Sequence, residues 1–347
     1  MPEQNAPINA ALVGFGTGGK LFHAPIISCA QNINLTAIVT GNPARQSQAQ
    51  KYQEAVIYES LDKLLAERSD IDLVVLTTPN STHHKLAIQA LQAGINVVVD
   101  KPFAVTTLEA DEMLKVASEQ NKIICPYQNR RFDSDFLTLK KVIKEGAVGK
   151  IMRLESRIER YRRLPKAGGW RETTSAQDGG GVLYDLGSHL IDQVVHLFGA
   201  PQRLSYARLE QMRGLGTSDD ATLILDYNDF CVHIHASMIC ASGGPRFRLL
   251  GLDGAYLKEL GDIQEDQLRA GLSPTSTDFG KEPQSSYGKL FRQDSSEAVI
   301  SEQGNWLAYY QQIAQAIKGE APPPVSKSEI LTTIKIIEQA LAMQQLI

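Results

Sequence analysis

Residues 8–19 read Ile-Asn-Ala-Ala-Leu-Val-Gly-Phe-Gly-Thr-Gly-Gly, and this stretch decides the fold. The first six residues form a short run that ends at a glycine, which is typical of a buried parallel strand. Glycines then recur as Gly-x-Gly-x-x-Gly before a predicted helix over 18–30. In this pattern the first glycine permits a tight turn, the second lets a pyrophosphate approach the backbone, and the third lets helix and strand pack closely. The helix N-terminus favours phosphate groups. The alternative is a tight turn in an unrelated α/β protein. The predicted dinucleotide-binding residues are Gly14, Phe15, Gly16 and Gly19.

Strand and helix signals alternate from this stretch to residue 125, which predicts βαβ units and a parallel sheet. Beyond residue 126 the predicted strands are longer, and several alternate polar and apolar residues, as is typical of an antiparallel sheet with one covered face. We therefore expect an α/β Rossmann domain over residues 1–125 and an α+β domain with an open, mainly antiparallel sheet over residues 126–347. A final helix over 327–346 can pack back on the first domain. The stretch 261–303, rich in Gly, Ser, Pro and Asp, is interpreted as a long loop that can cover a site.

Composition excludes several classes of protein. The 347 residues include 35 Lys and Arg and 39 Asp and Glu. The resulting net charge of −4 means that the chain has no overall excess of positive charge for binding nucleic acid. The apolar runs are far shorter than the roughly 20 residues of a membrane-spanning helix. The polar start shows no secretory signal, so we expect a cytoplasmic protein without a membrane partner. The four cysteines form no CxxC pair, and the histidine pairs lack a third ligand nearby, so we expect free thiols and no metal.

The end of the second predicted strand distinguishes NADP from NAD. An NAD enzyme usually has Asp or Glu about 20 residues past the glycine motif, where it binds the ribose 2′-hydroxyl. Here the chain reads Val-Thr-Gly-Asn-Pro-Ala-Arg over residues 39–45, without an acid. Thr40 and Asn42 can hydrogen-bond a 2′-phosphate and Arg45 can neutralise it, so the sequence favours NADP. If Arg45 is only a solvated helix residue, the enzyme uses NAD or both cofactors.

Two further motifs carry polar groups suited to catalysis. Lys101 lies in Val-Asp-Lys-Pro after a buried strand, at the sheet edge where ligands of open α/β sheets bind. Its ammonium can polarise a reacting oxygen, although a lysine at a strand end is usually solvated. Asp185 and His189 are four residues apart after a run of glycines, so on a helix they share one face and the carboxylate can orient the imidazole. The alternative is a core helix with a satisfied histidine.

Together these motifs resemble the Gfo/Idh/MocA family of oxidoreductases, and the resemblance covers essentially the whole chain. It rests on the glycine motif, on Asp100-Lys101-Pro102, and on Asp185-x-x-x-His189. Thr-Thr-Pro-Asn-Ser-Thr-His at 77–83 and Asn-Arg-Arg-Phe-Asp at 129–133 support it. The Phe-His-Ala-Pro stretch at 22–25 and the Asn-Arg-Arg stretch look most like the NADP-dependent scyllo-inositol dehydrogenase branch. Asp100 departs from the family, which usually has Glu there and so holds the lysine with a longer side chain.

The resemblance implies a function for these residues. The family lysine touches nicotinamide and substrate, and the family Asp and His bind substrate, with the His as proton acceptor. These catalytic roles carry over to Lys101, Asp185 and His189. The family also implies a homodimer or homotetramer formed through the C-terminal sheet. Further cofactor-binding positions that the resemblance implies are Thr78, Pro79, Asn80, His83 and Asn129.

The expected reaction is hydride transfer between NADP and a polyol or sugar hydroxyl or its ketone, with scyllo-inositol and inosose as the leading pair. A dihydrodiol or other carbonyl reductase, or a non-catalytic NADP(H)-binding sensor, remains open on the same fold. The cluster Arg-Tyr-Arg-Arg at 160–163 indicates either an anionic substrate or a solvated strand end, and the second interpretation is favoured. Candidate substrate-binding residues are Arg130, Tyr161 and Trp170, together with Arg163 and Arg171.

Overall fold

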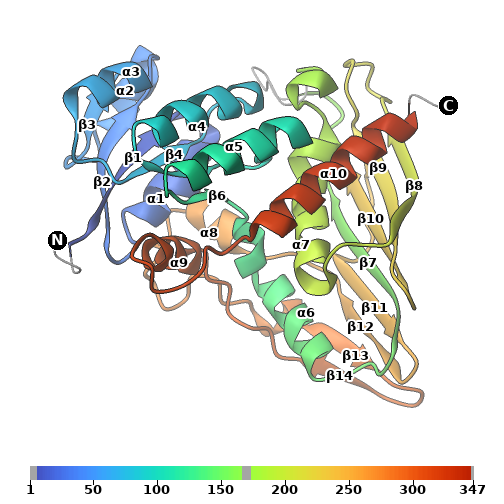
Figure 1. Ribbon diagram of the computed structural model, residues 1–347. Coiled ribbons are helices and arrows are strands. Elements are labelled where there is room, and N and C mark those ends of the chain that lie inside the picture. The colour runs from blue at the N-terminus through green and yellow to red at the C-terminus, as the bar shows by residue number, and fades with distance from the viewer. Residues whose placement is uncertain (1–5, 166–172, 345–347) are drawn as a thin grey trace.

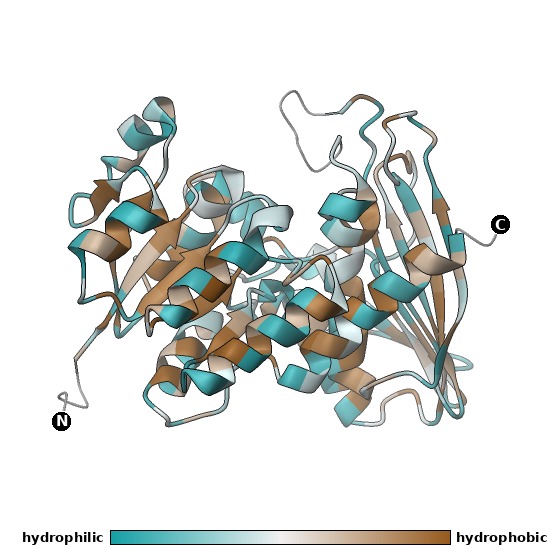
Figure 2. Cartoon of the chain, turned by 45° about the horizontal axis from the view of Figure 1, so that its top comes forward, coloured by the Kyte–Doolittle hydropathy of each residue, from teal (hydrophilic) through white to brown (hydrophobic). Residues whose placement is uncertain are grey.

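The computed structural model describes residues 6–165 and 173–344, and its first part is a parallel sheet with helices on both faces (Figure 1). Across the described residues this sheet has six strands in the order β3-β2-β1-β4-β5-β6, and every pairing in it is parallel. This is the Rossmann strand order, so the expected α/β domain is confirmed. Its strands are almost wholly apolar and buried (Figure 2). The elements are β1 (Ile8–Val13), η1 (Gly18–His23), α1 (Ala24–Ile27), β2 (Ile33–Val39), α2 (Pro43–Ala49), β3 (Val56–Tyr58), α3 (Leu61–Glu67), β4 (Leu73–Leu76), η2 (Asn80–Thr82), α4 (His83–Gln92), β5 (Asn96–Val99), α5 (Thr107–Glu119) and β6 (Ile124–Pro126).

The second part is an open sheet with helices packed on one face (Figure 1). Within the described ranges its eight strands follow the order β14-β13-β12-β11-β7-β10-β9-β8. All neighbours are antiparallel except β7 and β10, so the expectation of an open, mainly antiparallel sheet is confirmed. Its elements are η3 (Asn129–Phe132), α6 (Ser134–Lys144), β7 (Ile151–Glu159), η5 (Ala176–Asp178), η6 (Leu183–Gly187), α7 (Ser188–Phe198), β8 (Arg203–Glu210), β9 (Asp220–Asp226), β10 (Cys231–Ser237), β11 (Phe247–Gly251), β12 (Gly254–Lys258), α8 (Gln264–Arg269), η7 (Gln284–Ser286), β13 (Gly288–Phe291), β14 (Ser296–Val299), α9 (Leu307–Ile317) and α10 (Lys327–Gln344).

Residues 261–303 differ from the expected long loop, because they contain α8, η7 and the edge strands β13 and β14. A buried ion pair holds the segment: the Lys258 Nζ donates to the Glu282 Oε2 at 2.7 Å, and both side chains are fully buried. The Ser134 Oγ donates to the other Glu282 oxygen at 2.6 Å. These contacts are polar and join residues far apart in sequence. Residues 261–303 therefore show no local hydrophobic periodicity that would predict these elements.

The last two helices tie the two parts together. Helix α9 packs on α1, and Tyr309, Tyr310 and Ile313 belong to the core of the first domain. Helix α10 crosses from one core to the other (Figure 1): Ile330 and Ile334 pack in the first core, and residues 336, 337 and 340 in the second. It contacts α5 of the first domain as well as α7 and β8 of the second. The C-terminal chain therefore contributes to both cores, and it fixes the walls of the space between them.

None of the helices in the described residues combines the length and the apolar content needed to cross a membrane. The same ranges hold no cluster of three His, Cys, Asp or Glu side chains placed for a metal ion. The cysteines at 29, 125, 231 and 240 are free thiols. Assembly of two or four chains through the open sheet stays a prediction.

Candidate active site

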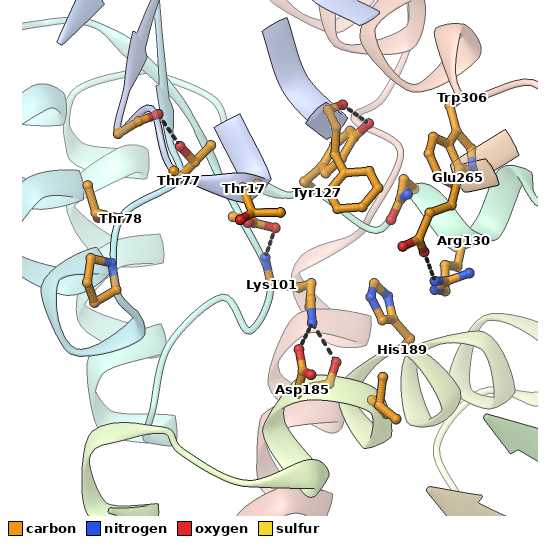
Figure 3. A pocket seen from close by; sticks show the side chains of 18 of the residues that line it. Thr17, Thr77, Thr78, Lys101, Tyr127, Arg130, Asp185, His189, Glu265 and Trp306 are labelled. Carbon is orange, nitrogen blue, oxygen red and sulfur yellow. Dashed lines mark hydrogen bonds and ion pairs between the residues drawn. The ribbon is translucent and has the colours of Figure 1, made fainter. Parts of the chain in front are cut away.

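A cavity of about 450 Å³ lies between the two parts of the chain, at the carboxyl ends of β1, β4 and β5 (Figure 3). Ligands of open α/β sheets bind at this edge, so the position agrees with the sequence prediction. The first domain contributes the glycine loop, Thr77–Pro79 and the Asp100–Lys101 segment. The second contributes the start of η3, the end of β7, η6, α7 and α8. The lining residues are Gly14, Gly16, Thr17, Gly18, Phe22, Arg45, Thr77, Thr78, Pro79, Asp100, Lys101, Tyr127, Asn129, Arg130, Arg160, Arg162, Asp185, Leu186, His189, Glu265, Arg269 and Trp306.

Glycine is suited to each of the three motif positions for a different structural reason. Gly14 has φ +98°, and a Cβ there would lie 2.9 Å from the Thr77 backbone. A Cβ at Gly19 would lie 2.2 Å from the Gly14 carbonyl oxygen, so these two positions need glycine for packing. At Gly16 a Cβ would meet only the Arg45 Nη1, at 3.9 Å, among the described residues. The space over Gly16 opens into the cavity, which is the cradle that a pyrophosphate needs. The chain therefore fits a dinucleotide at this loop.

Two of the helical segments that line the cavity, η1 and η6, have a wide, π-helical turn. They continue directly into α1 and α7. The helix predicted over 18–30 is thus a π-helical segment followed by a short α-helix that ends at Ile27. Residues of each π-helical segment line the cavity. Such turns concentrate at functional sites because they realign side chains within a helix.

Of the three residues predicted to select NADP, only Arg45 reaches the cavity. Thr40 is buried, and its hydroxyl lies 3.5 Å from the Asn42 N–H. The Asn42 carboxamide oxygen caps α2 by accepting the Arg45 backbone N–H at 3.2 Å. That cap places the Arg45 side chain at the start of α2, with its guanidinium beside Gly16. Thr40 and Asn42 therefore support the local structure, and Arg45 supplies the cationic group that faces the cavity.

Lys101 and Asp185 form a direct pair at the centre of the cavity (Figure 3). The Lys101 Nζ donates to the Asp185 Oδ1 at 2.8 Å and to the Asp185 carbonyl oxygen at 2.5 Å. Their side chains are only 12% and 20% exposed. The sequence spacing predicted that this carboxylate orients His189, but the structure directs it to the ammonium instead. A charged donor is the stronger partner for a carboxylate, and the tertiary fold brings it within reach.

His189 lines the cavity beside Lys101 and is 5% exposed. Its Nδ1 is buried and has no hydrogen-bond partner among the described residues. Burial, followed by the nearby charges of Lys101, Arg130, Arg160 and Arg246, lowers the pKa of His189 well below its ordinary value of 6.5. The imidazole is therefore neutral at physiological pH and able to accept a proton.

The other predicted site residues divide between the cavity and the packing behind it. Thr78, Pro79, Asn129 and Arg130 line the cavity. Phe15 is buried and its ring packs edge-on against Tyr52, while Gly19 lies under the loop.

Asn80 and His83 brace the loops around the cavity. The Asn80 carboxamide donates to the Gly179 carbonyl at 2.7 Å. The His83 ring nitrogens lie 3.0 Å from the carbonyl oxygens of Thr78 and Pro102.

Two predicted substrate contacts in the described residues, Tyr161 and Arg163, do not line the cavity. Tyr161 is 62% exposed, pairs in a short bridge with Ile239, and does not line the cavity. Its neighbours Arg160 and Arg162 do line it, so alternation along the extended chain directs the arginines inward. Trp170 and Arg171 lie outside the described residues.

Sequence reasoning missed an aromatic and charged wall formed by residues far apart in the chain. Tyr127 and Trp306 line the cavity, and the Trp306 indole donates to the buried Asp133 carboxylate at 2.7 Å. Glu265 and Arg269 reach it from α8. The interpretation that 261–303 covers a site pointed to the right segment, but no local pattern identified these two residues.

Comparisons with known proteins agree with this architecture. The family model described as "Oxidoreductase family, NAD-binding Rossmann fold" matches residues 8–128, and the one described as "Oxidoreductase family, C-terminal alpha/beta domain" matches residues 140–345. The scyllo-inositol 2-dehydrogenase (NADP(+)) IolW of Bacillus subtilis is 33% identical over 96% of this chain and 93% of its own length. The uncharacterized oxidoreductase YdgJ of Escherichia coli is 35% identical over 95% of this chain and 94% of its own. The structure of yvaA from Bacillus subtilis superposes with a TM-score of 0.91 at 32% identity, covering 100% of this chain and 98% of that one.

Proposed function

The chain belongs to the Gfo/Idh/MocA oxidoreductase family, which confirms the resemblance, and from that premise we propose that it is an NADP-dependent dehydrogenase of a polyol or sugar. The leading substrate pair is scyllo-inositol and its ketone, inosose. IolW, which is named for scyllo-inositol and NADP, supports this choice through its identity along almost the whole chain. The observation that carries the proposal is a neutral, buried His189 beside the Lys101 ammonium, in a cavity that opens from the glycine loop.

These two side chains suit the oxidation of a hydroxyl group. His189, whose lowered pKa keeps the imidazole neutral, accepts the hydroxyl proton as a general base. Lys101 donates a hydrogen bond to the same oxygen as negative charge develops there, and Asp185 holds the ammonium in place. The nicotinamide of a bound cofactor supplies the hydride acceptor. In the reverse direction His189 returns the proton to the oxygen of the ketone.

The cofactor side of the cavity favours NADP through Arg45. We expect Arg45→Gln to weaken NADPH binding by about tenfold to a hundredfold, because a charge-assisted hydrogen bond to phosphate contributes that much. NADH binding should change less than threefold, since NADH lacks the 2′-phosphate. Titration of nicotinamide fluorescence with each cofactor measures both constants. Arg68→Gln is a matched control, because Arg68 pairs with Asp70 outside the cavity. Equal losses for NADPH and NADH would contradict the assignment.

The test of the proposed function is reduction of NADP⁺ and NAD⁺, offered separately, with inositols, aldoses and diols. We expect NADP⁺ to be reduced with scyllo-inositol, which is followed at the absorbance band of the reduced nicotinamide. Turnover of dihydrodiols alone would replace the inositol proposal with the dihydrodiol alternative. Tight NADPH binding with no turnover of any substrate would favour the sensor.

A further inference from the structure

A cluster of arginines lines one part of the cavity. Arg130, Arg160 and Arg269, called here the arginine cluster, all line the cavity and all face Glu265. In Figure 3 Arg130 and Glu265 lie on one side of His189, whereas Thr77 and Thr78 lie on the other. The cofactor's phosphates are expected at the glycine loop beside Arg45, so they do not account for this second set of positive charges.

The carboxylates within reach do not satisfy the cluster. Over the described parts of the chain, the ion pairs of these three guanidinium groups involve only Glu265 and Asp133. Arg269 takes the closest contacts with Glu265, at 2.7 and 3.2 Å. Arg130 bonds Asp133 at 3.0 Å, and its Nε is buried without a partner among the described residues.

Arg160 is the least satisfied member. Among the residues that the structure describes, its one ion pair is with Glu265 and spans 3.6 Å, which exceeds hydrogen-bond length. Yet its backbone is fixed: the Arg160 N–H donates to the Ser237 carbonyl at 2.8 Å, and its carbonyl accepts the Cys240 N–H at 3.0 Å. Burial and the neighbouring Arg130 charge lower the pKa of Arg160. Arg160 is a positioned cation that lines the cavity, is 37% exposed and has no close partner in the described part of the chain, so it has donors available for a ligand anion.

We propose that the preferred substrate is a sugar or polyol that carries an anionic group, a carboxylate or a phosphate ester, which binds at the arginine cluster through Arg160 while its reacting hydroxyl lies at His189, and that neutral scyllo-inositol is a weaker substrate. The inference rests on the proposed function for the place of the hydroxyl. The planar guanidinium matches both kinds of anion with paired hydrogen bonds, which neutral hydroxyl groups do not equal in strength. An anion there would also offset the positive charge that the cluster holds beside His189. The interpretation of residues 160–163 as a solvated strand end is thereby replaced for Arg160.

The test compares three sugars that differ only at carbon 6: D-glucose, D-glucuronate and D-glucose 6-phosphate. Binding of each is measured by calorimetry, with and without saturating NADP⁺. The variants are Arg160→Gln and the control Arg153→Gln. Arg153 lies on β7 with the same 37% side-chain exposure and pairs with Glu155 outside the cavity, so both variants lose one charge of similar exposure. Thermal unfolding of each variant checks that the fold is retained.

We expect the wild type to bind at least one of the two anionic sugars about 10- to 100-fold more tightly than glucose. Arg160→Gln should remove that preference, and Arg153→Gln should keep it. The tighter of the two anions identifies carboxylate or phosphate as the group. Equal binding of all three sugars, no binding of either anion, or an equal loss in both variants would overturn the inference.

Reduction of NADP⁺ with scyllo-inositol and with each of the three sugars, measured on the same samples, reports separately on the proposed function. An anion preference that depends on Arg160, without turnover of any of these compounds, would uphold the arginine site and reject the dehydrogenase. Turnover of neutral polyols without any anion preference would do the reverse.

Discussion

Replacement of His189 by alanine is expected to lower the turnover number by about 10²- to 10⁴-fold, the range for loss of a positioned general base. NADPH affinity should change little, because its phosphates are expected at the glycine loop and Arg45 of the first domain, whereas His189 lies on α7 of the second. The fold should tolerate the change, since the buried Nδ1 of His189 has no partner among the described residues to leave stranded. Initial rates and a fluorescence titration with NADPH measure the two quantities. His84→Ala is the control, because His84 pairs with Glu112 on the surface outside the cavity.

The pH profile of the wild type tests the same residue by another route. A base acts in its neutral form, and burial together with the charges of Lys101, Arg130, Arg160 and Arg246 lowers the pKa of His189. The oxidation rate should therefore persist below pH 6.5 and decline only at a pH well under that value. An acid limb centred at or above pH 6.5 would contradict the lowered pKa of His189, and unchanged turnover in His189→Ala would remove His189 from the mechanism.

Replacement of Lys101 by methionine is the second large effect, with an expected loss of about 10²- to 10³-fold in turnover. The ammonium is the donor placed at the reacting oxygen, and methionine keeps the length of the side chain without the charge. Lys101→Arg should retain part of the activity, because it keeps a cation near Asp185. Lys115→Met, which affects an exposed pair with Glu119 on α5, is the control. A turnover number within threefold of wild type in Lys101→Met would contradict the role.

The pair with Asp185 makes this prediction sharper. If Asp185 acts by holding Lys101, then Asp185→Asn and Lys101→Met lower turnover by amounts that do not add in the double variant. The sequence spacing suggested instead that Asp185 acts on His189. In that case Asp185→Asn would reduce the activity of Lys101→Met further and would shift the acid limb of its pH profile. Rates of the two single variants and the double variant distinguish these roles.

The sequence identified the glycine loop because part of its requirements is local. The positive φ of Gly14 and the close approach of Gly19 to the Gly14 carbonyl lie within six residues, whereas the Thr77 backbone that Gly14 also packs against is distant in sequence. The strands and helices of the first domain follow from the same kind of local evidence, a hydrophobic periodicity that changes between strand and helix. His189 and Lys101 were found from short motifs that a family resemblance joined, and the cavity contains both.

Residues whose role depends on distant partners were not predictable in this way. The Lys101–Asp185 pair joins residues 84 positions apart, so the spacing of Asp185 to His189 indicated the wrong neighbour. The sequence favoured the interpretation of Arg160 as part of a solvated strand end, because the residues adjacent to it in sequence do not indicate that Arg130 and Glu265 lie nearby. The segment 261–303 lacked periodicity, since its buried apolar residues Leu268, Phe279 and Leu290 are widely spaced and the buried Lys258–Glu282 pair also holds it.

The parallel sheet and the dinucleotide loop thus follow from the sequence, because they depend largely on interactions among residues near one another along the chain. The assignment of Lys101 and His189 came from the family resemblance. Which charges meet in the cavity depends on the tertiary fold. It paired Asp185 with Lys101 and gathered the arginine cluster around Glu265 from η3, the end of β7 and α8. The physical reason is that a Coulomb interaction depends on distance in space and on burial, and neither quantity is encoded in the spacing of residues along a chain.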